Sequence, residues 1–149
     1  MSDGRQVSRA EGCINVDGQT ARAGRLLLAG LGGSVRYKPD GLYQYTQAEM
    51  SRRILALIPA LWRNWLQRGR ALDILITHAP PRGIHDTAHP DSDSAHVGFE
   101  AFLPLLRRFR PRYLLHGHSH VWTTRQVTHT RYAATDVINV YPYKIIEIE

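Results

Sequence analysis

Two short apolar runs in this chain each end in histidine. The first covers residues 72–76 and leads through a threonine to His78, and the second covers residues 113–115 and leads into His116-Gly117-His118-Ser119-His120. Short apolar runs bounded by turn-forming residues are typical of buried strands. The pattern therefore predicts core strands over 72–77 and 112–116, each with histidine at its carboxyl end.

The segment between these two strands has the pattern of a helix. Residues 98–110 place apolar side chains at helical spacing, and Pro111 ends the pattern. A strand, a helix and a strand in this order form a βαβ unit whose strands run parallel. Ligands of such sheets gather beyond the carboxyl ends of the strands. We therefore expect His78 and His118 to share a site.

A longer helix is expected earlier in the chain. Thr46 and Glu49 have the spacing of a capping box, in which the threonine caps the helix and the glutamate reaches back. The helix should run to about Arg68, with Gly69 as its stop. Pro59 lies inside the pattern and predicts a kink or a break.

Both ends of the chain have strand patterns. Short strands are expected over 13–17 and 25–29, the second broken by the glycine-rich stretch 30–33, with a polar loop over 34–45. In the tail, β-branched residues alternate in three stretches that predict antiparallel strands, 123–130, 132–140 and 143–149. The expected fold class is α/β, with a βαβ core followed by antiparallel strands.

Length and composition fit one compact domain. The chain has 149 residues, of which 43% are hydrophobic and 21% charged. No apolar stretch approaches the roughly 20 residues of a membrane span. A single cysteine, Cys13, excludes an internal disulfide and favours a reducing compartment. We expect a flexible lead at 1–12, one domain over 13–149, no membrane partner and a cytoplasmic location.

Arginine supplies most of the positive charge. The formal net charge is +6, and arginines cluster at 52–53, 63–70 and 107–112. Such a surface attracts phosphate-bearing ligands, nucleic acid among them. The clusters lack interleaved aromatic residues and match no nucleic-acid-binding motif, and we interpret Trp62 and Trp65 as packing at the core and its rim. Solvated helix faces are the preferred interpretation, and nucleic acid is a partner that the sequence allows without favouring it.

The histidines after the second strand have a spacing that suits metal ligands. Gly117 has no Cβ and permits a sharp turn, which would let neighbouring imidazoles approach one point. Imidazole binds zinc, iron and manganese ions. His116 should point away from His118, because side chains alternate along a strand. Further histidines and aspartates crowd the loop at 79–97, where we prefer a solvated polar surface over substrate contacts or substitute metal ligands.

The two histidine blocks resemble the last two metal-binding blocks of the calcineurin-like metallophosphoesterases. The resembling segments are Thr77-His78-Ala79-Pro80-Pro81 and Gly117-His118-Ser119-His120, with 28–34 and 137–143 similar to one bacterial branch of that family. The resemblance implies a two-sheet β-sandwich flanked by helices and a site for two divalent ions, manganese, iron or zinc. It assigns His78 and His118 to one ion and His120 to the other.

The resemblance implies hydrolysis of a phosphomonoester or phosphodiester by a metal-activated hydroxide. The family's N-terminal blocks have no counterpart, since residues 1–149 contain no Asp-x-His, no Gly-Asp and no Asn-His. No catalytic residue is therefore assigned. We expect a partial domain, the C-terminal portion of a longer enzyme, with weak or no activity alone.

Two other interpretations stay open. One is a non-catalytic remnant that binds a metal ion, or that binds nucleic acid through its arginine surface. The other is a homo-oligomer, in which a second chain covers strand edges and apolar surface that a missing N-terminal half would otherwise cover.

Overall fold

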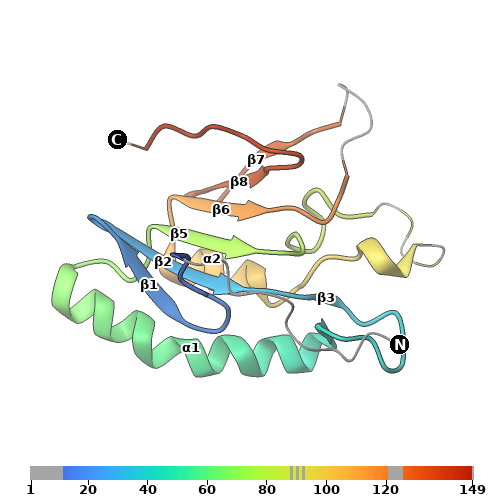
Figure 1. The fold of residues 1–149 in the computed structure, drawn as a ribbon, viewed down its shortest axis with the longest axis horizontal. Coiled ribbons are helices and arrows are strands. Elements are labelled where there is room, and N and C mark those ends of the chain that lie inside the picture. Colours follow the sequence, from blue (N-terminus) through green and yellow to red (C-terminus); the bar gives the residue numbers. More distant parts are fainter. Residues whose placement is uncertain (1–11, 88, 90, 92, 121–125, 149) are drawn as a thin grey trace.

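The computed structural model describes residues 12–87, 89, 91, 93–120 and 126–148. Its main feature is a six-stranded sheet whose central strands are parallel, while each edge strand is antiparallel to its neighbour (Figure 1). In spatial order the strands are β1 (Thr20–Ala23), β2 (Leu26–Leu31), β5 (Ile74–Thr77), β6 (Tyr113–His116), β8 (Thr135–Asn139) and β7 (His129–Tyr132). This arrangement confirms the expected α/β class and its parallel βαβ core. The lead expected at 1–12 lies, apart from Gly12, outside the described residues.

The long helix α1 (Gln47–Arg68) begins and ends where the sequence predicts. The Thr46 hydroxyl accepts a hydrogen bond from the Glu49 amide at 3.2 Å, and the Glu49 carboxylate accepts one from the Thr46 amide at 2.7 Å. Gly69 ends the helix in the left-handed conformation at φ 71°. The helix continues through Pro59, so no break occurs there. In the part of the chain that the structure describes, no helix combines the length and apolar character that crossing a membrane requires.

We expect Thr46→Ala to lower the free energy of unfolding by about 1 kcal/mol. The alanine side chain cannot accept the Glu49 amide hydrogen, which has no partner inside the first turn of α1. Equilibrium urea unfolding, followed by circular dichroism, measures the change. Thr46→Ser keeps the hydroxyl and is the matched control, and equal losses in the two variants would contradict a capping role.

The second helix, α2 (Phe102–Phe109), begins four residues later than the expected start at Gly98. The reason is a β-bridge between Phe99 and Pro81, in which the Phe99 amide donates to the Pro80 carbonyl at 3.0 Å. Backbone held in that bridge cannot also be helical. Pro104 lies in the first turn of α2, where a missing N–H leaves no intrahelical bond unmade. A short 3-10 helix, η1 (Ser94–His96), precedes the bridge.

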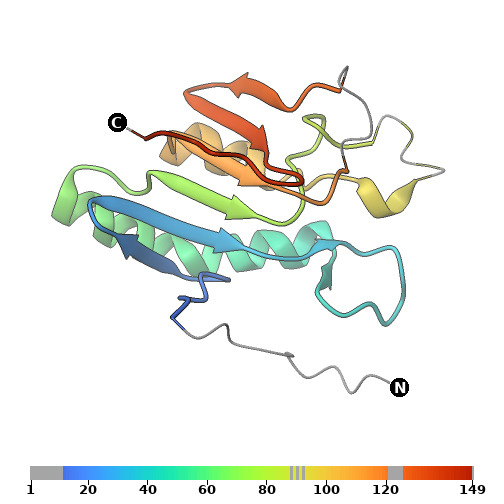
Figure 2. The same cartoon turned by 45° about the horizontal axis from the view of Figure 1, so that its top comes forward.

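The helices α1 and α2 pack on the same face of the sheet (Figure 2). Apolar side chains of α1 and α2 meet those of the central strands in one buried cluster, which includes Leu57, Leu61, Phe102, Leu106, Leu75 and Leu114. On the opposite face, Ile76 of β5 is 37% exposed. The only other sheet in the described part of the chain is the pair β3 (Ser34–Val35) and β4 (Gln44–Tyr45), inside the expected polar loop. The described residues therefore contain one of the two large sheets of the expected sandwich.

The N-terminal strands differ from the prediction in position and in extent. Instead of a strand over 13–17, only Asp17 makes a bridge, and β1 lies further along the chain. The β2 strand runs through Gly30, where the sequence suggested a break. A Cβ built on Gly30 would lie 2.6 Å from the Val16 side chain. Glycine at this position therefore permits a close chain crossing and does not end the strand.

The tail is partly as expected. The strands β7 and β8 form the predicted antiparallel pair, and β8 joins β6 in parallel. Residues 143–148 are not a strand, which corrects the third predicted tail strand. Positions 121–125, which include the start of the first predicted tail strand, lie outside the described residues.

Candidate metal centre

The parallel strands β5 and β6 bring two histidines into contact. His78 follows the last residue of β5, and His118 lies two residues beyond the end of β6. The Nε2 atom of His78 is 2.9 Å from the Nδ1 atom of His118, and the ring centroids are 4.6 Å apart. The predicted juxtaposition at the carboxyl edge of the sheet is therefore present. Whether the pair binds a metal ion stays a prediction.

The sharp turn that brings His118 back toward His78 is made by a residue other than the expected one. His118 itself has a positive φ of 64°, while Gly117 is not among the glycines with positive φ. A Cβ built on Gly117 would meet nothing within 4 Å. The left-handed conformation is costly for a residue with a side chain and is commonest at functional sites. The sequence pattern predicts the turn correctly, but the residue with the left-handed backbone is His118 and not Gly117.

The second ring nitrogen of His118 fixes the orientation of the imidazole. Nε2 of His118 lies 2.6 Å from the Ala95 carbonyl oxygen, so Nε2 carries the hydrogen and donates it. In the neutral ring, Nδ1 then carries an electron pair that faces His78 and accepts the hydrogen on the Nε2 atom of His78. A ring N–H bonded to a carbonyl is the usual support of a metal-binding histidine, because it directs the other nitrogen at the ion.

Both histidines of this pair are favoured in the neutral form. Burial lowers the pKa of His78 from its ordinary value, and the neighbouring His118 lowers it further. Burial also lowers the pKa of His118, although its hydrogen bond to Ala95 opposes that shift. Neutral imidazole is the form that binds metal ions, so the electrostatics of this edge suit a ligand role.

His120 lies at the same edge of the sheet as the pair. Its ring stacks on Tyr141, with centroids 4.4 Å apart and planes 16° apart. It lines a cleft of about 310 Å³ together with Asp93 and His96, whose side chains are 2.7 Å apart. The protonated form of His120 contributes to lowering the pKa of His118, which places the two rings near each other. The structure thus gathers all three predicted ligands at one edge and brings two into contact.

His116 has a structural role, which agrees with the expected direction of its side chain. The residue is 1% exposed, and its Nδ1 atom donates to the Gly117 carbonyl at 2.9 Å. Its Nε2 atom is 2.9 Å from Nδ1 of His85, whose own Nε2 atom is 2.9 Å from the Thr130 hydroxyl. This chain of hydrogen bonds ties the loop at 79–97 to the sheet. For His85, the prediction of a solvated loop residue is wrong.

The hydrogen-bonded histidines His85 and His116 predict a dependence of stability on pH. Burial lowers the pKa of each to about 4, whereas an unfolded histidine binds its proton near the ordinary value of 6.5. Between these values the unfolded chain holds more protons, so the free energy of unfolding falls as the pH drops from about 6.5 to about 4. Urea unfolding at intervals of half a pH unit measures this slope. His85→Gln removes one titrating group and should make the slope shallower; an unchanged slope would contradict the assignment.

Asn139 is a site residue that the sequence analysis missed. It ends β8, the neighbour of β6, and is 2% exposed. Its side-chain amide donates to the Ser119 carbonyl at 2.7 Å, and its side-chain oxygen accepts from the Tyr141 amide at 3.0 Å. Asn139 therefore links the backbone of Ser119 to the backbone of Tyr141. Tyr141 is the residue on which His120 stacks. A polar residue at the end of an apolar strand was the available signal.

The donor set fits part of a metal site. Within the ranges that the structure describes, no group of three or more His, Cys, Asp or Glu side chains is arranged to hold an ion. His78 and His118 can fill two of the four positions around a zinc-like ion. A two-metal centre also needs carboxylate ligands to offset the charge of the ions. The described residues alone therefore do not make up a two-metal centre.

Comparisons with known proteins agree with this fold. The sequence matches the family profile described as "Calcineurin-like phosphoesterase" over residues 8–122. No curated protein is significantly similar to the chain. The crystal structure of TT1561 of Thermus thermophilus superimposes with a TM-score of 0.52 and 19% sequence identity, covering 85% of this chain and 48% of that one. Another crystal structure gives a TM-score of 0.51 with 16% identity, covering 84% of this chain and 44% of the other.

The chain spans just under half the length of these two solved structures. Identities below 20% show a shared fold and no more. The match to the family profile covers well over half of the 149 residues and includes all three predicted histidine ligands. The sequence match, the sheet order and the histidine pair agree, and the chain belongs to the calcineurin-like phosphoesterase family.

Proposed function

We propose that this chain contributes the histidine-bearing edge of a metal-dependent phosphoesterase site. His78 and His118 bind one divalent ion, and His120 contributes to a second. The remaining ligands, carboxylates among them, come from outside the described residues. The substrate is a phosphomonoester or a phosphodiester, and the described residues alone give little or no turnover.

One observation carries this proposal, the contact between His78 and His118. The two imidazoles are favoured in the neutral form, and their facing nitrogens, hydrogen-bonded at 2.9 Å, lie close enough to turn toward one ion once the hydrogen between them is released. The hydrogen bond from His118 to Ala95 directs one ring before any ion arrives. Family membership supplies the reaction class, since paired ions in such sites activate a hydroxide and stabilise phosphoryl charge. The role of this chain's own residues is to bind and orient.

Hydrolysis assays test this proposal. The chain is incubated with Mn²⁺ and with p-nitrophenyl phosphate or bis(p-nitrophenyl) phosphate, alone and with an added polypeptide that carries the missing Asp-x-His, Gly-Asp and Gly-Asn-His-Asp blocks. We expect no turnover above the His78→Ala/His118→Ala variant for the chain alone, and turnover that needs both histidines after the addition. Full metal-dependent turnover by the chain alone would refute the incomplete site. Complemented turnover that survives loss of both histidines would refute their role.

A further inference from the structure

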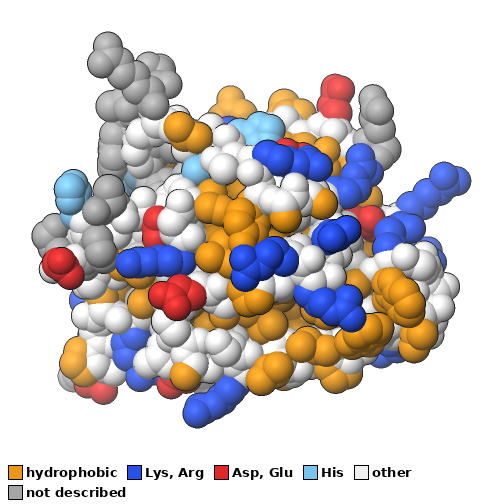
Figure 3. Space-filling model, turned by 180° about the vertical axis from the view of Figure 1, so that it is seen from behind, with side chains coloured by type: hydrophobic (Ala, Val, Ile, Leu, Met, Phe, Trp, Pro, Cys, Tyr) orange, Lys and Arg blue, Asp and Glu red, His pale blue; other side chains and the backbone are white. Residues whose placement is uncertain are grey.

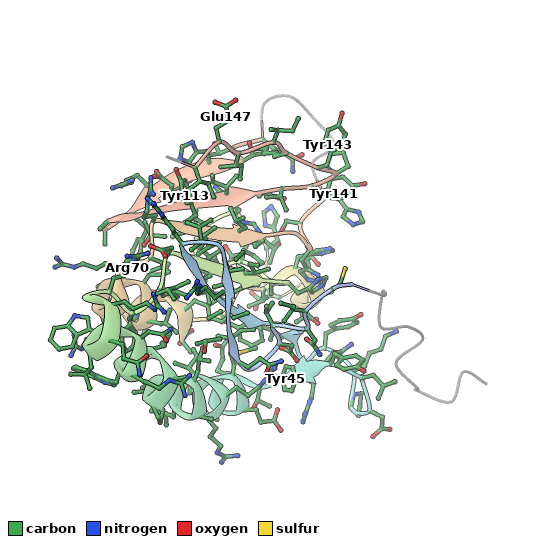
Figure 4. The ribbon with its side chains drawn as sticks, turned by 60° about the vertical axis from the view of Figure 1, so that its left-hand side comes forward. Tyr45, Arg70, Tyr113, Tyr141, Tyr143 and Glu147 are labelled. Carbon is green, nitrogen blue, oxygen red and sulfur yellow. The ribbon has the colours of Figure 1, made fainter. Side chains whose placement is uncertain are left out.

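A second concave site lies at the other end of the sheet. A cleft of about 470 Å³ is formed where α1 and α2 end and where the chain enters β5 and β6. Its lining includes Trp62, Trp65, Arg70, Arg108, Arg110 and Arg112. Figure 4 shows Arg70 and Tyr141, the stacking partner of His120, at opposite ends of the sheet. The cleft is therefore separate from the histidine edge.

The aromatic part of this cleft is open to solvent. Trp62 is 38% exposed and Trp65 is 50% exposed, and their rings meet edge to face with centroids 5.6 Å apart. The guanidinium carbon of Arg108 lies 4.8 Å from the centre of the Trp62 ring. The two indoles are at the rim and not in the core. Exposed indole faces held by a neighbour are surfaces on which a planar ring can stack.

The rest of the lining is strongly basic. Four arginines line the cleft with one acidic residue, Asp73, whose carboxylate oxygens already accept from the Leu27 amide at 2.7 Å and from Arg70 at 2.8 Å. The carboxyl ends of α1 and α2 each bring about half a negative charge, so the balance of the cleft stays positive. Figure 3, seen from behind, shows Lys and Arg side chains beside hydrophobic surface on its right-hand half.

From these contacts we infer that the cleft binds a single nucleotide, with the base stacked on Trp65 and the phosphates held by Arg110 and Arg112. The volume is in the range of small-ligand pockets, roughly 300–1,000 Å³. Guanidinium groups match phosphate oxygens in a planar, two-point geometry. The fold brings Trp62, Trp65 and Arg70 together with Arg108, Arg110 and Arg112, which lie some 40 positions later in the sequence. A nucleoside diphosphate satisfies both the aromatic and the anionic part of the site.

Calorimetric titration with ADP in EDTA tests this inference, because the chelator removes any contribution of metal at the histidine edge. We expect one ADP per chain, with adenosine and pyrophosphate each binding about ten-fold more weakly or worse. Trp65→Ala and Arg110→Glu should each weaken ADP binding about ten-fold or more. Arg52→Glu makes the same charge change on an exposed part of α1 outside the lining, and should stay within about two-fold of the parent chain.

Three results would overturn the inference. If ADP binds no tighter than pyrophosphate does, the charge of the phosphates accounts for the binding and the base makes no stacking contribution. Binding unchanged by Trp65→Ala and Arg110→Glu would place the nucleotide elsewhere. A ten-residue oligothymidylate that displaces ADP and binds more than about ten-fold tighter would make single-stranded nucleic acid the ligand. Circular dichroism confirms that each variant is folded. None of these outcomes depends on phosphoesterase activity.

Discussion

Replacing His118 with alanine is expected to lower the Zn²⁺ affinity of the chain about 100-fold. The variant keeps only one imidazole of the contacting pair, and loss of even a supporting group around a metal ligand costs about 10–100-fold. His78→Ala should give a loss of the same size, since each ring fills one position on the same ion. Competition with a zinc-sensitive dye at pH 7.5 measures the affinity, at a pH where both rings are neutral.

Two further variants make this result specific. His120→Ala should change the affinity by no more than about three-fold, because the His120 ring stacks on Tyr141 and is proposed to serve a different ion. His129→Ala removes an exposed imidazole of the edge strand β7, which pairs with Asp136 of β8, and controls for loss of any histidine. If the parent chain and His118→Ala bind zinc equally, the pair is not a metal site.

Asp73→Ala is expected to lower the free energy of unfolding by about 2–4 kcal/mol. The Asp73 carboxylate is buried before β5, where it accepts from the buried Leu27 amide at 2.7 Å and from Arg70 at 2.8 Å. Alanine leaves that amide without an acceptor and removes the carboxylate that pairs with Arg70, which keeps its hydrogen bond to the Arg25 carbonyl. For a domain of this size the midpoint of thermal unfolding should fall by about 6–12 °C. Urea and thermal unfolding measure the two quantities.

An aspartate on the surface of the same sheet provides the control. Asp136 pairs with His129 and Arg131, whose side chains are both 59% exposed, so Asp136→Ala should cost no more than about 1 kcal/mol. Asp73→Asn keeps an oxygen acceptor for the Leu27 amide and should fall between the two alanine variants. Equal losses for Asp73→Ala and Asp136→Ala would show that the buried carboxylate contributes no more than a surface ion pair.

The features that the sequence predicted well are those with local causes. The capping box of α1 depends on two residues three positions apart, and its glycine stop follows directly after the last helical residue. The histidine edge was predictable because parallel strands must end on one side of a sheet, and both His78 and His118 follow strand patterns. Topology thus brought together residues that are 40 positions apart without any knowledge of side-chain contacts.

The features that the sequence left undecided depend on contacts between distant segments. Gly30 looked like a strand break because nothing local shows that Val16 crosses it. His85 looked solvated because its partners, His116 and Thr130, are 31 and 45 positions away. The basic cleft was missed for the same reason. Its tryptophans and most of its arginines belong to two helix ends that only the packing of α1 and α2 brings together.

The left-handed backbone of His118 sets stability against function at one position. A non-glycine residue in this conformation costs roughly 1–2 kcal/mol, which glycine would not. A redesign of this chain guided by folding energy alone would therefore choose glycine there, and would gain a more stable protein that has lost one of its two contacting imidazoles. Sequence optimisation of this domain should hold His118 fixed, because the side chain that makes its backbone conformation costly is one that the proposed chemistry needs.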